Sequence, residues 1–222
     1  MLSIVPTPIG NTQDITLRTL ELFRNVDYII SENTHTSKKL LGIYDIDTSQ
    51  KTFVKFTSHD TYRIEHILED LTTKDALLVS EAGTPALSDP GKLLIQTAQD
   101  AWIPITILPG ANALIPAVIM SNFPTTHRSF YGFLPHKKWR MTLLQDMIAS
   151  DRPSFFYESV HRISKLVEQL SELNYIGKIS IAREISKLHE QFVTYDLPSI
   201  QASLQDGSLP QRGEFVIGLY PL

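Results

Sequence analysis

The sequence contains no cysteine. This absence excludes disulfides, a cysteine nucleophile and the thiolate sites that hold zinc or iron–sulfur clusters. No apolar run approaches the roughly 20 residues that cross a bilayer. Residues 1–6, MLSIVP, lack the basic start and the cleavage region of a signal peptide. We therefore expect a cytoplasmic protein without a membrane segment.

Positive charge is also scarce, because 20 Lys and Arg stand against 24 Asp and Glu, for a net charge of −4. Proteins held on nucleic acid by bulk electrostatics usually carry a basic domain or stripe. Only local basic patches remain for such a role, and the best candidates are Lys38-Lys39 and residues 136–140, HKKWR.

Several standard ligand motifs are missing. There is no G-x-G-x-x-G, since residues 1–50 contain only Gly10 and Gly42, and neither a Walker G-x-x-x-x-G-K-[ST] nor a G-x-S-x-G elbow occurs. These absences argue against an NAD-binding Rossmann unit, a P-loop NTPase and an α/β-hydrolase. The seven histidines show no compact ligand spacing, so we predict no metal.

The first half of the chain alternates short apolar runs with helical patterns. Strands are predicted at 2–6, 27–31, 52–56, 76–80 and 104–108, and helices at 15–24, 34–41, 64–71, 92–100 and from the Pro109-Gly110 stop to about 120. Asp14 is the expected N-cap of the first helix. Continuous apolar strands separated by helices indicate an α/β unit with a mainly parallel sheet.

The pattern restarts after a linker-like segment at 121–128. Strands are then predicted at 129–133, 154–158, 178–183 and 214–220, with helices at 137–149, 160–173 and 199–205. We predict two α/β domains, residues 1–122 and 123–222.

Four loops that follow predicted strands are rich in Gly, Pro or small polar residues: 6–11, 80–91, 109–113 and 157–159. In open α/β sheets, ligands bind beyond the carboxyl ends of the strands. Gly and Pro there leave backbone groups available to a ligand. Any α/β protein also needs such turns, so the loops alone leave both interpretations open.

The order of motifs along nearly the whole chain resembles the ribosomal RNA small subunit methyltransferase I family of the tetrapyrrole methylase superfamily. The motifs that carry this resemblance are TPIGN at 7–11, DITLR at 14–18, SEAGTP at 80–85, SDPG at 88–91, PG at 109–110, GFLP at 132–135, FYES at 156–159, HR at 161–162, AREISK at 182–187 and GEFV at 213–216.

The resemblance implies a homodimer that binds S-adenosyl-L-methionine in a cleft between two α/β domains. It also implies transfer of the methyl group to the ribose 2′-hydroxyl of a cytidine in small-subunit (16S) rRNA. Matched onto this chain, the implied cofactor-binding residues are Pro8, Gly83, Thr84, Pro85, Ser88, Asn112, Ala113, Tyr157, Glu158 and Arg183. Tyr157 is equally suited to the core. The candidates for a general base or a positioning group are Glu32, His35, Glu184, Lys187 and Glu190, and no catalytic residue is assigned among them.

The chain departs from the family pattern at several positions. Glu81 stands where the family usually has Asp, and Asn33 and His35 replace an acid and an arginine. Ala111-Asn112 stands where Pro-Ser is more usual, and many relatives continue past the last strand, whereas this chain stops at Leu222. Two alternatives therefore stay open: a tetrapyrrole methyltransferase, or a non-catalytic homologue that binds the cofactor or the ribosome.

Two further segments have more than one interpretation. Residues 136–140 either hold RNA phosphates and stack a base, or form the solvated start of a helix with Trp139 packed inward. His161-Arg162 follows a predicted strand end and is a further site candidate.

Overall fold

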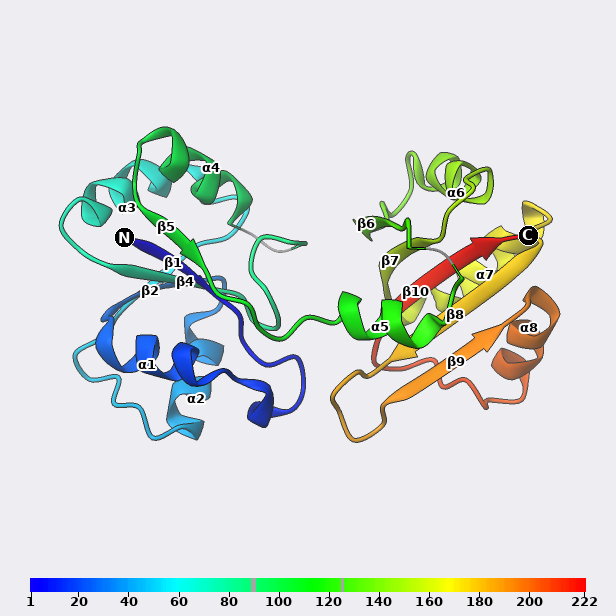
Figure 1. Cartoon of the computed structure of the whole chain (residues 1–222), viewed down its shortest axis with the longest axis horizontal. Helices are drawn as coiled ribbons and strands as arrows, with labels where there is room; N and C mark the ends of the chain where they lie inside the picture. Colours follow the sequence, from blue (N-terminus) through cyan, green and yellow to red (C-terminus); the bar gives the residue numbers. More distant parts are fainter. Residues whose placement is uncertain (89–90, 125) are drawn as a thin grey trace. The chain divides into compact units, whose positions relative to one another are not determined.

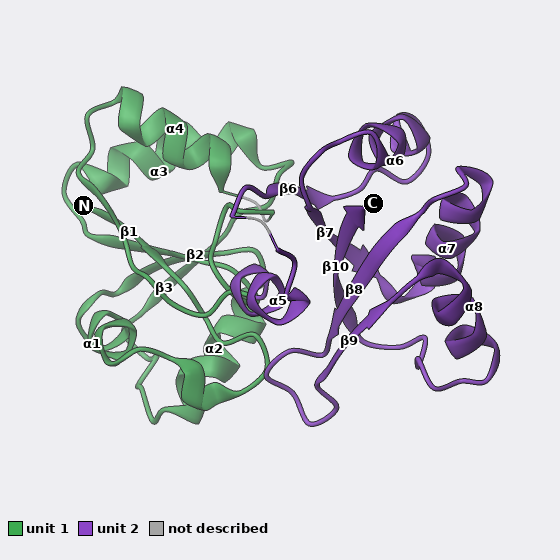
Figure 2. Cartoon of the chain, turned by 45° about the vertical axis from the view of Figure 1, so that its right-hand side comes forward, with its two compact units in different colours: residues 1–112 green, residues 113–222 purple. Residues whose placement is uncertain are grey.

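The computed structural model describes residues 1–88, 91–124 and 126–222, which form two compact units, 1–112 and 113–222 (Figure 2). Each unit is built on its own five-stranded sheet. Asp89, Pro90 and Thr125, which belong to the predicted ledge and linker, lie outside the described residues. Across the described part of the chain, no helix is both long and apolar enough to span a bilayer.

The sheet of unit 1 is entirely parallel, where the sequence predicts a mainly parallel one. Its strands are β1 (Leu2–Val5), β2 (Tyr28–Ser31), β3 (Thr52–Lys55), β4 (Ala76–Val79) and β5 (Ile105–Ile107), in the order β3-β2-β4-β1-β5. Every residue of β1, β2 and β4 is buried. This burial on both faces explains why these strands are apolar runs rather than alternating ones.

Helices cover both faces of this sheet (Figure 1). The helices α1 (Leu17–Asn25) and α2 (Thr34–Ile43) contribute to one buried cluster, and α3 (Ile64–Leu71) and α4 (Lys92–Asp100) to the other. The connection after β1 therefore leaves on one face and the connection after β4 on the opposite face. Since β1 and β4 are neighbours, a topological switch point lies at their carboxyl ends, where open α/β sheets bind ligands.

The start of α1 differs from the prediction. Asp14 lies in a short 3₁₀ helix, η1 (Thr12–Asp14), and the N-cap of α1 is Thr16, whose hydroxyl accepts the N–H of Thr19 at 3.1 Å. The prediction that Asp14 caps this helix is wrong, because a threonine two residues later satisfies the free N–H groups. A second 3₁₀ helix, η2 (Thr61–Arg63), leads into α3.

Unit 2 has a mixed sheet. Its strands are β6 (Ser129–Phe133), β7 (Ser154–Ser159), β8 (Gly177–Arg183), β9 (Gln191–Tyr195) and β10 (Glu214–Pro221), in the order β6-β7-β10-β8-β9. Only β6 and β7 pair in parallel, and the other neighbours are antiparallel. The sequence prediction misses β9, a partly exposed edge strand whose Gln191 and Thr194 interrupt the apolar pattern.

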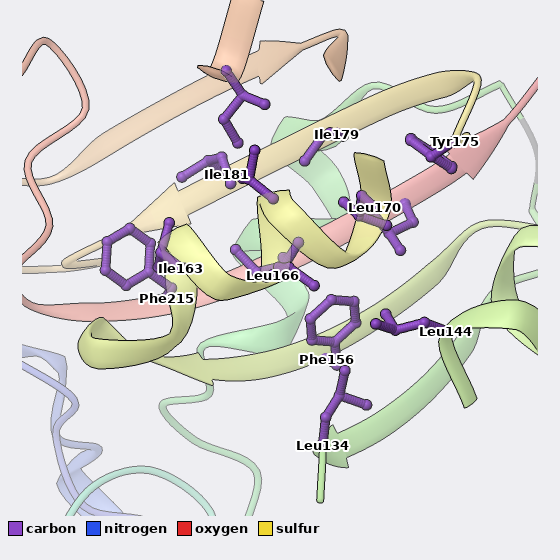
Figure 3. Close-up of a cluster of buried hydrophobic side chains, with 14 of the residues drawn as sticks. Leu134, Leu144, Phe156, Ile163, Leu166, Leu170, Tyr175, Ile179, Ile181 and Phe215 are labelled. Carbon is purple, nitrogen blue, oxygen red and sulfur yellow. The ribbon is translucent and has the colours of Figure 1, made fainter. Parts of the chain in front are cut away.

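Three helices pack on one face of this sheet: α6 (Arg140–Ile148), α7 (Ile163–Glu172), which follows the 3₁₀ helix η3 (Val160–Arg162), and α8 (Leu197–Gln205). Figure 3 shows the core that they form, in which Leu166 of α7 and Leu144 of α6 join Phe156 of β7. The helix α5 (Leu114–Ser121) packs against β8, β9 and β10.

The division between the units lies before α5, at 112/113, and so comes earlier than the predicted 122/123. The reason is that α5 packs on the strands of unit 2, with Ala117 buried and Phe123 in ring contact with Phe155 of β7. The apolar sequence of α5 does not tell on which sheet the helix packs, and only Ala117 and Ser121 of the helix are buried.

Candidate functional site

The loops after β1 and β4 are joined at the switch point of unit 1. Thr7 and Gly83 exchange both backbone hydrogen bonds, each with an N···O distance of 2.9 Å. The Thr7 hydroxyl donates to the carbonyl of Ser80 at 3.2 Å, and the Ser80 hydroxyl donates to the carbonyl of Gly83 at 2.8 Å. These bonds fix the segment that begins the SEAGTP motif.

Gly83 needs to be glycine for two reasons. Its φ of +80° lies in the left-handed region, and a Cβ atom there would lie 3.2 Å from Cγ2 of Ile9. The next residue, Thr84, donates its hydroxyl to the carbonyl of Ala111 at 3.2 Å, which ties in the loop after β5. Gly110 of that loop lies against Pro6, because a Cβ on Gly110 would come within 2.7 Å of the proline Cβ. The three loops therefore form one closely packed ledge, which we call the β1–β4–β5 ledge.

The ledge includes a buried polar atom that none of the described residues satisfies. The hydroxyl oxygen of Ser88 is buried and has no hydrogen-bond partner among the described residues. Buried polar groups are nearly always hydrogen-bonded, so such an atom at the carboxyl edge of a sheet indicates a ligand or an ordered water. S-adenosylmethionine presents ribose hydroxyls, an adenine edge and an amino-acid group, which hydroxyl and backbone groups can bind. The residues of the ledge therefore fit this cofactor.

The other residues predicted for the cofactor in unit 1 lie on or next to the same ledge. Pro8 is half-buried in the loop after β1, Pro85 is buried beside Thr84, and Asn112 ends the loop after β5. Thr7, which the prediction omitted, holds the ledge together. The TPIGN motif was the signal for it, although only the hydrogen bonds show the role of its hydroxyl.

Two departures from the family pattern have local structural roles. Asn33 is the N-cap of α2, and its Oδ1 accepts the N–H groups of His35 at 3.2 Å and Thr36 at 3.4 Å. Asparagine and aspartate perform this role about equally well. Glu81 is exposed, and its Oε1 accepts the hydroxyl of Thr36 at 3.4 Å, so its longer side chain reaches α2.

In unit 2, the predicted residues Glu158 and Arg183 lie near the carboxyl ends of β7 and β8. Both pair with Phe215 of β10, the strand between them. Ala113, which precedes α5, lies in this unit as well. Tyr157 is half-buried and makes ring contacts with Phe130 and Phe133, with centroids 5.1 and 5.2 Å apart.

The carboxylate of Glu158 is buried between two arginines. One oxygen lies 2.5 Å from a terminal nitrogen of Arg140, and the other lies 2.6 Å from Nε of Arg162. Arg140 also donates Nε to Gln169 at 2.8 Å. Of residues 136–140, for which the sequence left both an RNA-binding and a helix-start interpretation open, Arg140 is not available to RNA, because its side chain is buried in this ion pair. Cofactor contact by Glu158 stays a prediction. Since both carboxylate oxygens are paired with arginines, such a contact would involve the main chain of Glu158.

Arg183 is buried too, and it donates to the carbonyls of Arg212 at 2.6 Å and His189 at 3.1 Å. It therefore joins the segment after β8 to the segment before β10. Whether Arg183, Ala113 or Tyr157 also contacts the cofactor stays a prediction.

The segment after β8 holds a partly buried charge cluster. Lys187 Nζ lies 3.0 Å from Oε1 of Glu184 and 2.9 Å from Oε2 of Glu214. Burial opposes ionisation of Glu184, but hydrogen bonds from the Glu214 N–H and from Lys187 outweigh it and lower the pKa of Glu184. Burial likewise disfavours the charged Lys187, but its bonds to Glu214 and Glu184 outweigh this and raise the pKa of Lys187.

The remaining candidates for a base differ in setting. Glu190 accepts the backbone N–H of Ser186 at 2.7 Å and so braces the same segment. Glu32 is half-buried directly after β2, and His35, three residues later, is exposed. The structure does not single out any of them as the catalytic base.

A doubly wound parallel unit with this ledge, followed by a mixed-sheet unit, defines the tetrapyrrole methylase class. Residues 1–201 match the family model described as Tetrapyrrole (Corrin/Porphyrin) Methylases. A uroporphyrin-III C-methyl transferase from Thermus thermophilus, solved in complex with S-adenyl homocysteine, shares the fold with a TM-score of 0.63 and 14% identity, over 99% of this chain and 96% of that one.

The sequence comparisons are more specific. The chain is 39% identical over 193 residues to the ribosomal RNA small subunit methyltransferase I of Thermotoga maritima, covering 86% of each chain. It is 35% identical over 221 residues to the protein of the same name from Hydrogenobaculum, covering 98% of this chain and 94% of that one. The chain belongs to the ribosomal RNA small subunit methyltransferase I family of tetrapyrrole methylases. The resemblance and the fold class predicted from the sequence are both confirmed.

Proposed function

We propose that this protein transfers a methyl group from S-adenosyl-L-methionine to the ribose 2′-oxygen of a cytidine in small-subunit rRNA. The observation that carries the proposal is the β1–β4–β5 ledge. It places the SEAGTP motif at the switch point of a parallel sheet and leaves the buried Ser88 hydroxyl without a partner among the described residues. The names of the relatives support the choice of rRNA as substrate.

When bound, the cofactor supplies an electrophilic methyl group, which the ribose oxygen takes up as that oxygen loses its proton and S-adenosylhomocysteine is left. The residues of this chain bind and orient the reactants. Gly83, whose N–H and carbonyl are both bonded to Thr7, sets the course of the chain on the ledge. Thr84 offers its main chain there, and the Ser88 hydroxyl offers one further hydrogen bond. Alignment of this kind supplies up to roughly 7–11 kcal/mol of the barrier reduction.

A ribose hydroxyl becomes a good nucleophile only when a base takes its proton. The lowered pKa of Glu184 makes this carboxylate a weak base, and Lys187 stays protonated at neutral pH because its pKa is raised. We infer that this pair fixes the geometry of the loop after β8, and that the proton is taken by another group. The enzyme is proposed to act as a homodimer in the cytoplasm, where ribosomal subunits are assembled.

The test is transfer of a labelled methyl group from S-adenosylmethionine to small ribosomal subunits that lack the modification, followed by mapping of the labelled nucleotide. Label on the 2′-oxygen of one cytidine is the expected result. Label on a base, or transfer only to a tetrapyrrole precursor, would refute the rRNA 2′-O assignment. Binding of S-adenosylhomocysteine without any transfer would point to a non-catalytic homologue.

A further inference from the structure

Trp139 is held in an unusual and exposed position. It is 63% exposed, and its φ of 69° lies in the left-handed region, which is unfavourable for a bulky residue. Its carbonyl accepts the N–H of Leu143 at 2.9 Å and so begins α6. Strained residues persist only where the surroundings impose them.

The residues on both sides of Trp139 impose this position. Arg140, the next residue, is buried through its ion pair with Glu158. Glu158 also binds Arg162, whose terminal nitrogen donates to the carbonyl of Leu134 at 3.0 Å. One buried carboxylate and two arginines therefore fix the beginning and the end of the loop between β6 and α6. The indole ring lies at a fixed point of the surface and contributes little to the core.

One lysine lies against the ring, and further cationic and aromatic residues are exposed in the same loop and on the segment that follows β7. His136, Lys137 and Lys138 are exposed, and Lys138 Nζ lies 5.3 Å from the centroid of the Trp139 ring. Phe133, at the end of β6, is 55% exposed. The exposed His161 precedes Arg162 on the neighbouring segment, where Arg162 Nε donates to the Ser159 hydroxyl at 3.1 Å. In a chain of net charge −4, this is a local concentration of positive charge.

We propose that residues 133–139 and His161 form a surface that binds single-stranded RNA, with a base stacked on Trp139 and phosphates held by Lys137 and Lys138. The inference rests on the proposed function, because it names the face that the rRNA substrate contacts. An exposed indole among lysines is the combination that binds unpaired nucleotides, since any base offers a face for stacking. A paired base in a duplex does not offer that face, so the partner is an unpaired segment.

The chain contains two tryptophans, and the second provides a matched control. Trp102 is 92% exposed and also has a left-handed backbone, with φ 57°, but its neighbours are Ala101 and Ile103 rather than lysines. In W102F the only indole is Trp139, and in W139F the only indole is Trp102. A single-stranded RNA of about 12 nucleotides is titrated into each variant while the tryptophan fluorescence is recorded. Quenching in W102F but not in W139F is the expected result.

A kinetic experiment adds the enzyme's own substrate. W139A is expected to raise KM for small ribosomal subunits about 5- to 150-fold without changing the affinity for S-adenosylhomocysteine, whereas W102A changes neither. The slope of log affinity against log salt for the RNA is expected to fall by about 0.7 for each lysine removed in K137A and K138A.

The results separate the two proposals. Methyl transfer with the same KM in W139A and no quenching in W102F would overturn the surface and leave the proposed function intact. Absence of methyl transfer in the unmodified protein would overturn the proposed function. The RNA titration of W102F and W139F would still show whether residues 133–139 bind single-stranded RNA. Quenching by intact subunits but not by RNA would overturn the RNA assignment in favour of a ribosomal protein.

Discussion

Thr7 and Gly83 form an antiparallel backbone bridge just beyond two parallel strands. Val5 of β1 pairs in register with Val79 of β4. Thr7, two residues after Val5, and Gly83, four residues after Val79, then join through two hydrogen bonds of 2.9 Å. The direction of one segment relative to the other has therefore reversed between the two points, and Gly83, at the bridge, has a left-handed backbone. The bridge therefore fixes the position of Thr84 and Pro85 relative to the end of the sheet.

Gly83→Ala is expected to cost both stability and cofactor affinity. A left-handed alanine costs about 1–2 kcal/mol, and its Cβ would also press on Ile9 and move the ledge. Gly207→Ala is the matched control, since its φ is +79° and a Cβ there meets nothing within 4 Å. Urea unfolding should show a loss in both variants, larger in G83A because of the contact with Ile9, whereas calorimetry should show weaker S-adenosylhomocysteine binding only in G83A. Equal affinities in the two variants would remove the ledge from the cofactor site.

Ser88→Ala is expected to leave the free energy of unfolding within about 1 kcal/mol of the unmodified protein, because no hydrogen bond to a described residue is lost. Its affinity for S-adenosylhomocysteine is expected to fall up to about tenfold, the value of one hydrogen bond. Ser154→Ala in unit 2 is the control, because that hydroxyl is also buried and without a partner in the described structure. An unchanged affinity in S88A would mean that a water, and not the cofactor, meets this hydroxyl.

Asn33→Ala is expected to destabilise unit 1 by about 1 kcal/mol, because the backbone N–H groups of His35 and Thr36 lose their cap. Asn33→Asp restores the usual acid of the family and keeps the cap, so its stability should match that of the unmodified protein. Thermal unfolding of the two variants checks this. If N33D also changes the rate of methyl transfer, residue 33 acts on the reaction as well as on the helix.

The sequence is most informative where burial is complete. The apolar runs of β1, β2 and β4 predict a parallel sheet because both faces are covered. The half-exposed edge strand β9 carries no such signal. Arg140 is a clear example of information that only the fold supplies, because Glu158 and Gln169, its partners, lie far away in the sequence. The residues of the ledge were predicted by resemblance, whereas the Thr7–Gly83 bridge depends on the pairing of β1 with β4.

Glu184→Gln is expected to change how the stability of the protein depends on pH. The pKa of Glu184 is lowered from 4.5, so the folded state releases this proton more readily than the unfolded state. Its stabilisation is therefore fully present above about pH 4.5 and is lost as the pH falls through the lower, folded value. Lys187 has a pKa raised above 10.5, so its contribution is complete below that pH and is lost only as the pH rises further.

The measurement is urea unfolding of the unmodified protein and of E184Q between pH 3 and pH 8. The difference in free energy should be about 1 kcal/mol and constant at neutral pH, and it should shrink below about pH 4.5. Glu172→Gln is the control, since Glu172 is exposed on α7 and should give no comparable difference. A difference that persists unchanged to pH 3 would show that Glu184 stabilises the segment through its shape and not through its charge.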